Sequence, residues 1–294
     1  MTAQTTTRTT AAQPTVSVPT DGQTEQSLVY KSVNGKDIYL EFLPPASTVF
    51  EKAPVYYILS GGGWASCNRE NMIAFSGHSV RKLRAKGFAV VSADYRLVGD
   101  GAVMENMVSD VMDAARYLKK YADVLQIDAD KLVTSGHSAG GQLALMLAYA
   151  PHDFTEESVL TDCDFTVIGT VPLSAPTVMY PDEEGACLCS FTTDRLFACK
   201  RADSEEGRRG SPITYAAVKK VPTLLIAGEK DDLVYPENSK RFCKAVQKAG
   251  GDCRLILCQN GGHSFEAIDP TQPTDPAPLV LQNEIVKFAE ALVC

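Results

Sequence analysis

The 294-residue chain lacks any apolar run long enough to cross a membrane, and it lacks an excess of positive charge. Its net charge of −8 argues against binding to nucleic-acid phosphates or to anionic membrane surfaces. The N-terminal residues also lack the apolar core of a secretory signal. We therefore expect a cytoplasmic protein without a membrane span; the alternative is a secreted protein whose signal peptide was removed upstream.

The sequence also lacks cysteine pairs at the spacing typical of a zinc site. The chain has nine cysteines, but Cys187 and Cys189 form a lone pair with no second pair at zinc-ribbon distance. We therefore predict no metal and no cofactor. Free thiols in a reducing compartment are the simplest interpretation of the cysteines. Disulfides near Cys187, Cys189 and Cys199 are the alternative for an exported protein.

The first 26 residues are rich in Thr, Gln and Pro and show no periodicity. This composition predicts a disordered tail or linker over residues 1–26 and one catalytic domain over 27–294. An N-terminal arm that packs on the domain is the alternative interpretation.

The rest of the chain alternates strand and helix patterns. Alternating residues on both sides of Asn34-Gly35 predict a hairpin over 28–33 and 37–42. Continuous apolar runs predict buried strands at 55–59, 88–93, 132–135, 167–173, 223–227 and 254–258. Helical spacing predicts helices at 79–86, 104–125, 142–149, 239–249 and 279–293. We therefore predict an α/β fold, with a mostly parallel, twisted sheet covered by helices on both faces.

Residues 175–217 interrupt this alternation and are rich in Asp, Glu, Cys and Arg. We predict that they form a small lid-like excursion over the C-terminal edge of the sheet, where sites of α/β proteins lie.

The candidate nucleophile is Ser138, in Gly136-His137-Ser138-Ala139-Gly140. This pentapeptide stands between a predicted strand and a predicted helix, where a tight turn lifts the serine hydroxyl above the sheet. Upstream, Ser60-Gly61-Gly62-Gly63-Trp64 follows another predicted strand. Its glycines leave N–H groups free for a developing oxyanion, and the amide of Ala139 is the expected second contributor.

The chain has only four histidines, so elimination is useful. His137 lies inside the serine turn, His78 precedes it, and His152 follows the helix after it. His263 comes just after the last predicted strand, where the base of a serine hydrolase belongs. The acid should follow the preceding strand, so Asp231 is preferred and Asp232 is the alternative.

Together these motifs resemble the acetyl esterase/lipase branch of the α/β-hydrolase superfamily, close to the hormone-sensitive-lipase-like and feruloyl-esterase-like enzymes. The resemblance covers about residue 28 to the C-terminus and includes Asp94-Tyr95-Arg96-Leu97, which looks like the structural element beneath the glycine loop. It implies the α/β-hydrolase fold and a catalytic triad of Ser138, Asp231 and His263.

The resemblance also implies an oxyanion hole formed by Gly62, Gly63 and Ala139. Trp64 and His137 are the expected substrate-binding neighbours. The chain departs from the family pattern at Ser60, where related loops usually carry histidine before the glycines. Because the donors of the hole are main-chain groups, the chemistry should survive this replacement.

The expected activity is that of a serine carboxylesterase acting on short-chain or carbohydrate-linked esters, of acetyl or feruloyl type, through an acyl-enzyme on Ser138. A peptidase or formamidase on the same fold is an alternative, as is a catalytically silent homologue that binds a ligand. The expected partner is a small-molecule or saccharide ester, with no nucleic acid. The sequence does not predict the oligomeric state.

Overall fold

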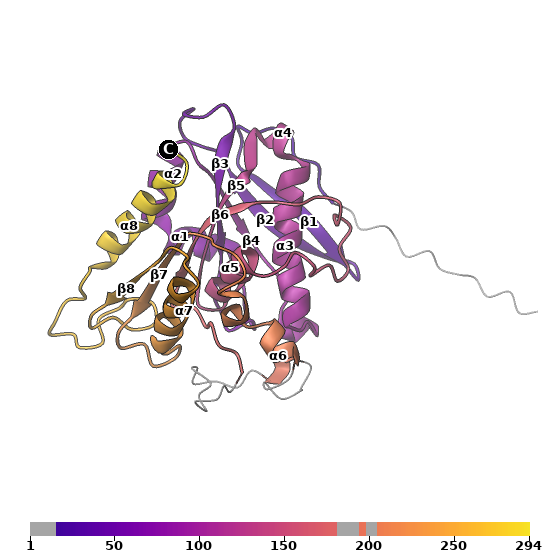
Figure 1. Cartoon of the computed structure of the whole chain (residues 1–294). Helices are drawn as coiled ribbons and strands as arrows, with labels where there is room; N and C mark the ends of the chain where they lie inside the picture. The colour runs from indigo at the N-terminus through magenta and orange to yellow at the C-terminus, as the bar shows by residue number, and fades with distance from the viewer. Residues whose placement is uncertain (1–15, 181–193, 198–204) are drawn as a thin grey trace, which may run out of the picture.

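The computed structural model describes residues 16–180, 194–197 and 205–294. Its centre is an eight-stranded sheet in the order β1-β2-β4-β3-β5-β6-β7-β8 (Figure 1). The strands are β1 (Gln26–Val33), β2 (Lys36–Leu43), β3 (Ala53–Leu59), β4 (Ala89–Ala93), β5 (Ile127–His137), β6 (Val167–Leu173), β7 (Thr223–Gly228) and β8 (Cys253–Cys258). β1 pairs antiparallel with β2 and β2 with β4, whereas all other pairs are parallel. The predicted antiparallel edge and parallel centre are therefore present.

Helices cover both faces of the sheet (Figure 1). The main helices are α1 (Arg69–Phe75), α2 (Gly77–Ala85), α3 (Met104–Lys120), α5 (Ala139–Tyr149), α7 (Glu237–Lys248) and α8 (Pro278–Ala291). Buried side chains of α3, α5 and α7 share one hydrophobic cluster with one face of the sheet. Those of α1, α2 and α8 share another cluster with the opposite face. Since β3, β4 and β7 lie between these layers, every residue in them is buried.

Element boundaries differ from the sequence prediction in several places. The helix expected over 104–125 ends at Lys120, and a separate short helix, α4 (Ala122–Leu125), follows. The helix expected from 142 begins at Ala139, directly after the serine turn. The sequence analysis missed α1, whose first turn is capped by the Asn68 side chain accepting from the Asn71 N–H at 2.7 Å.

Residues 16–25 differ from the expected disordered tail, because they pack against the domain. The Ser17 N–H donates to the Val29 carbonyl at 2.8 Å, and the Tyr117 hydroxyl donates to the Ser17 carbonyl at 2.9 Å. The Val29 N–H in turn donates to the Ser17 hydroxyl at 3.0 Å, so both main-chain groups of Val29 in β1 are occupied. For residues 16–25, the alternative of a packed arm therefore describes the structure better. Residues 1–15 lie outside the described part of the chain.

A buried charge network fixes α3 against the sheet edge. Lys31 of β1 is 2% exposed and forms ion pairs with Asp110 at 2.9 Å and Asp113 at 2.8 Å, both on α3. Arg96 also pairs with Asp110 at 2.8 Å. Because buried charges are costly when unpaired, these contacts hold α3 in one position. The first turn of α3 contributes to the cavity described below.

The described parts of the predicted excursion contain η2 (Asp194–Phe197), α6 (Glu205–Arg209) and η3 (Pro212–Tyr215). α6 lies near the first turn of α3 (Figure 1). The disulfides considered near Cys187, Cys189 and Cys199 fall outside the described residues. Within the described ranges, the cysteines are free thiols: Cys67, Cys163, Cys243, Cys253, Cys258 and Cys294. In the same ranges, no helix has both the length and the apolar character needed to span a membrane.

Candidate active site

Ser138 occupies a sharp turn between β5 and α5. Its backbone φ is +56°, a left-handed value that is costly for a residue with a side chain. The surrounding main chain holds it there, since the Ser138 N–H donates to the Leu173 carbonyl of β6 at 2.8 Å. The neighbouring glycines are required by close packing: a Cβ on Gly136 would lie 2.3 Å from the Gly140 carbonyl oxygen. This geometry is that of a strained strand-to-helix turn which presents a serine.

Asp231 and His263 meet at the same end of the sheet. The Asp231 Oδ2 accepts a hydrogen bond from His263 Nδ1 at 2.8 Å. Because a carboxylate can only accept, this bond places the ring hydrogen on Nδ1 and leaves Nε2 able to take a proton. Asp231 is 3% exposed, and its other oxygen accepts from the N–H groups of Leu233 and Val234. Asp232, the alternative acid, is exposed instead.

His137 places His263 beside the serine turn. Its Nε2 donates to the His263 carbonyl at 2.9 Å, and the centroids of the two rings lie 4.7 Å apart. The structure therefore brings three predicted segments together: the serine turn, the Asp231 loop and the His263 loop. The other histidines are engaged elsewhere, His78 with Asn283 and His152 with Asp164.

Burial lowers the pKa of His137 to about 4. The ring is thus neutral at neutral pH. In the unfolded chain an ordinary histidine takes up a proton near pH 6.5. The unfolded state therefore binds more protons between pH 6.5 and 4, and His137 destabilises the fold progressively as the pH falls through that range.

His137→Phe is expected to remove this pH dependence. The free energy of unfolding of the wild type should fall relative to the variant by about 3 kcal/mol between pH 7 and pH 4, the value of a shift of this size. Urea denaturation of both proteins at several pH values measures the difference. Parallel stability curves would show that His137 is protonated normally in the folded protein.

The glycine loop packs directly on the serine turn. A Cβ on Gly61 would lie 2.8 Å from the His137 carbonyl oxygen and 3.0 Å from the Ser138 Cβ. Gly62 and Gly63 have φ values of +127° and +60°, which favour glycine. In the part of the chain that the structure describes, the backbone N–H groups of Gly62, Gly63 and Ala139 donate to no protein acceptor. These three groups are the oxyanion-hole donors that the sequence analysis predicts.

Ser60 holds this loop in place of the histidine that related loops carry. Its hydroxyl accepts from the Asn68 N–H at 3.0 Å and lies 3.0 Å from the Cys67 sulfur. Its carbonyl accepts from the Tyr95 hydroxyl at 3.0 Å. The neighbouring Asp94 carboxylate accepts a hydrogen bond from the Arg69 guanidinium at 2.5 Å. Tyr95 thus contacts the first residue of the glycine loop and Asp94 contacts the segment that follows it, whereas Arg96 pairs with Asp110 of α3.

Trp64 corrects one expectation. Its side chain is 1% exposed and belongs to the main hydrophobic core, so it does not form a substrate-facing wall. The indole N–H donates to the Gln142 Oε1 at 3.2 Å. A large apolar ring with a satisfied polar atom is more stable in the core than against solvent. His137 does line a surface hollow of about 320 Å³, together with Ser60, Gly61 and Phe75.

Gln142 is a residue that the sequence analysis did not identify. It is fully buried on α5, one helical turn after Ser138. Its Oε1 contacts Trp64 of the glycine loop, and its Nε2 donates to the Gly210 carbonyl at 2.9 Å and to the Met104 sulfur at 3.3 Å. One amide therefore connects α5, the glycine loop, the start of α3 and the segment after α6.

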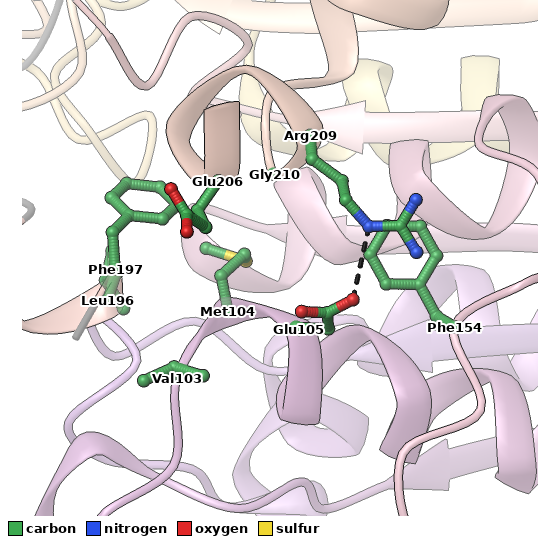
Figure 2. Close-up of a pocket in the computed structure, with 9 residues that line it drawn as sticks. All are labelled: Val103, Met104, Glu105, Phe154, Leu196, Phe197, Glu206, Arg209 and Gly210. Atoms are coloured by element: carbon green, nitrogen blue, oxygen red, sulfur yellow. Dashed lines mark hydrogen bonds and ion pairs between the residues drawn. The ribbon is translucent and has the colours of Figure 1, made fainter. Parts of the chain in front are cut away.

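Beyond Gln142 lies a cavity of about 190 Å³ between the start of α3, η2 and α6 (Figure 2). Its lining residues are Val103, Met104, Glu105, Phe154, Leu196, Phe197, Glu206, Arg209 and Gly210. The Arg209 guanidinium lies against the Phe154 ring (Figure 2). Its Cζ is 4.1 Å from the ring centroid, and its Nε donates to Glu105 at 3.2 Å. Across the described residues, no cluster of His, Cys, Asp and Glu has a metal-binding arrangement.

Comparison with known proteins identifies the family and the fold. The BD-FAE family model matches residues 37–246. Among solved structures, Thermogutta terrifontis esterase 2 phosphoramylated by tabun superposes with a TM-score of 0.73 at 21% identity, covering 94% of this chain and 95% of that one. The same esterase with propionate bound gives 0.72 at 23% identity, covering 90% and 94%. The predicted α/β-hydrolase fold is confirmed.

Curated relatives are much longer proteins. The non-reducing polyketide synthase stbA of Stachybotrys bisbyi is 31% identical over 82% of this chain, and ausA of Emericella nidulans is 22% identical over 82%. The chain spans 14% and 13% of their respective lengths. The similarity is therefore to one part of these synthases.

Proposed function

The chain belongs to the BD-FAE family of α/β-hydrolases, and on that premise we propose that it is a serine carboxylesterase that forms an acyl-enzyme on Ser138. The family and the esterase neighbours support an esterase of the α/β-hydrolase type. The observation that carries the finer proposal is the Asp231–His263 hydrogen bond, made beside a serine held in a strained turn. A serine needs a base to become nucleophilic, and that base needs an orienting acid.

The proposed reaction has two steps. His263 Nε2 removes the Ser138 hydroxyl proton while the serine oxygen attacks the ester carbonyl carbon. The carbonyl oxygen becomes an oxyanion, which the N–H groups of Gly62, Gly63 and Ala139 stabilise. The intermediate expels the alcohol, which takes the proton from His263. Water then attacks the acyl-serine by the same route and releases the acid and free Ser138.

Short-chain and carbohydrate-linked esters of acetyl or feruloyl type are the proposed substrates. The solved propionate complex of a related esterase supports a short acyl group. The hollow beside Gly61 also supports a sugar-linked alcohol, because its lining includes the uncharged polar side chains of Ser66, Asn68 and Asn71. Such groups can donate to and accept from sugar hydroxyls.

The polyketide synthase relatives favour a second candidate, hydrolysis of an ester or thioester of a polyketide acid. The catalytic chemistry is unchanged, since the serine attacks the same carbonyl carbon. A peptidase or formamidase on this fold would require protonation of a leaving nitrogen instead of an oxygen. A silent homologue would retain the pocket without covalent chemistry.

A fluorophosphonate probe and an ester series distinguish these functions. Folded protein is expected to form a stoichiometric adduct on Ser138, located by peptide mass spectrometry. It should also hydrolyse acetyl esters faster than anilides or formamides. Methyl ferulate, an acetylated sugar and an acyl thioester then rank the substrate classes. If folded protein, checked by circular dichroism, forms no adduct, a serine-hydrolase function is excluded and the silent ligand-binding homologue is retained.

A further inference from the structure

We propose that the cavity between α3, η2 and α6 is a specificity pocket for the non-reacting hydrocarbon group of the ester, and that it selects neutral aryl or branched alkyl groups over carboxylated ones. This inference rests on the proposed esterase function. It extends that function by assigning a new binding site and a class of group to it.

The first argument is position. Met104 and Gly210 line the cavity, and the Gln142 side chain donates to both. Gln142 lies four residues after Ser138 on α5, which corresponds to about 6 Å along a helix. On its other side Gln142 accepts from Trp64 of the glycine loop. The Gln142 side chain therefore joins the cavity wall to the glycine loop that packs on the serine turn.

The second argument is shape and polarity. Most of the lining is apolar: Val103, Met104, Phe154, Leu196 and Phe197. Figure 2 shows Met104 in the middle of this group, with Phe197 and Phe154 on opposite sides. The cavity has about 190 Å³. An apolar cavity of about 150 Å³ already binds benzene, so a single ring or a branched chain fits this space.

The third argument is charge. Glu105 and Glu206 line the cavity, and Arg209 is the cation among its described lining residues. Arg209 already pairs with Glu105 and with Asp153, both at 3.2 Å. Burial raises the pKa of the nearby Glu156, and the negative charge of Glu105 raises it further. Among the described lining residues, a carboxylated substrate would therefore meet a cation, Arg209, that two protein carboxylates already bind.

Gly210→Ala tests the pocket sterically. The added Cβ would lie 2.7 Å from the Met104 Cγ and 2.9 Å from the Phe197 Cε1, so these side chains must move into the cavity. The carbonyl that Gln142 bonds is unchanged, and Gly210 does not have a positive φ. Gly99→Ala is the matched control, because its Cβ meets nothing within 4 Å. Thermal melting checks that both variants fold.

Three esters, followed by pH-stat, separate the two sides of the substrate. Methyl acetate has no bulky group, methyl 3-phenylpropanoate carries a ring on the acyl side, and 2-phenylethyl acetate carries it on the alcohol side. Gly210→Ala is expected to lower kcat/KM about tenfold for one of the phenyl esters, the usual effect of a misfit of one methyl group. Methyl acetate should stay within twofold of wild type, and Gly99→Ala should match wild type for all three.

Equal losses on all three esters would make Gly210 merely structural, and no loss would remove the cavity from substrate binding. Either result overturns the pocket while leaving the esterase function intact. Wild type that hydrolyses methyl acetate but neither phenyl ester also overturns the pocket. Failure to hydrolyse any ester overturns the proposed function itself.

The charge argument has its own test. The test uses whichever phenyl ester Gly210→Ala affects, methyl 3-phenylpropanoate or 2-phenylethyl acetate. Wild type is expected to have a kcat/KM for this ester at least about tenfold higher than for its para-carboxylated analogue. Glu105→Gln should reduce this preference, because it removes a negative charge and frees part of Arg209. Glu237→Gln, on the surface of α7, is the control. An unchanged preference in Glu105→Gln would overturn the charge selection.

Discussion

Ser138→Ala is expected to lower kcat for ester hydrolysis by about 10⁶-fold, the loss that follows removal of the nucleophile in a triad enzyme. The reason is specific to the proposed reaction, since no acyl-enzyme can form without the Ser138 oxygen. Purified variant and wild type are compared on methyl acetate, under conditions that detect the slow uncatalysed reaction. Labelling by a fluorophosphonate should be lost in parallel.

The control for this variant is Ser47→Ala, in the exposed segment between β2 and β3. It should keep both activity and labelling. Because alanine removes only the hydroxyl from the strained turn, thermal melting of Ser138→Ala should show a folded protein. Residual labelling of folded Ser138→Ala at the wild-type rate would place the nucleophile on another serine.

Asp231→Asn is expected to lower kcat by about 10⁴-fold, as in triads whose acid is replaced by its amide. An amide can present its NH₂ group to the imidazole, which would then hold the hydrogen on Nε2 instead of Nδ1. His263 could no longer accept the serine proton. Asp232→Asn is the matched control, because Asp232 is adjacent in sequence but exposed, and it should retain nearly full activity.

Stability must be measured beside activity in this comparison. Asp231 Oδ1 also accepts from Leu233 and Val234, so part of the effect of Asp231→Asn could come from the loop. A variant that melts like wild type and still loses turnover isolates the effect on His263. If Asp232→Asn lost more activity than Asp231→Asn, Asp232 would be the catalytic acid.

Much of the fold could be predicted from the sequence because local pattern and burial agree there. The runs in β3, β4 and β7 are apolar on both sides, and both sides are covered by helices. α1 was missed because seven residues carry too little periodicity. Residues 16–25 have the composition of a tail, yet their order depends on main-chain bonds to β1, which composition does not report.

The candidate site, too, could be predicted only in part from the sequence. The proposed triad of Ser138, Asp231 and His263 could be predicted because each residue follows a strand whose end is marked in the sequence, and the structure places the last two in hydrogen-bond contact. The sequence analysis expects Trp64 beside the substrate, whereas its side chain lies in the core. Whether the side chain after a glycine loop packs into the core depends on its tertiary partner, which for Trp64 is Gln142. No sequence pattern predicted that pairing or the cavity beyond it.

The Gln142 amide also bears on how this enzyme could be redesigned. Its hydrogen bonds fix the glycine loop and the wall of the cavity at the same time. Changes to substrate preference made at Met104, whose side-chain sulfur accepts from Gln142, are therefore not independent of changes in turnover. We therefore expect substitutions in the cavity and substitutions around Trp64 to be epistatic. Enlarging the cavity without losing turnover would need compensating substitutions around Trp64. In laboratory evolution of new specificity, we consequently expect substitutions in the cavity wall to be accompanied by substitutions near Trp64, on the other side of Gln142.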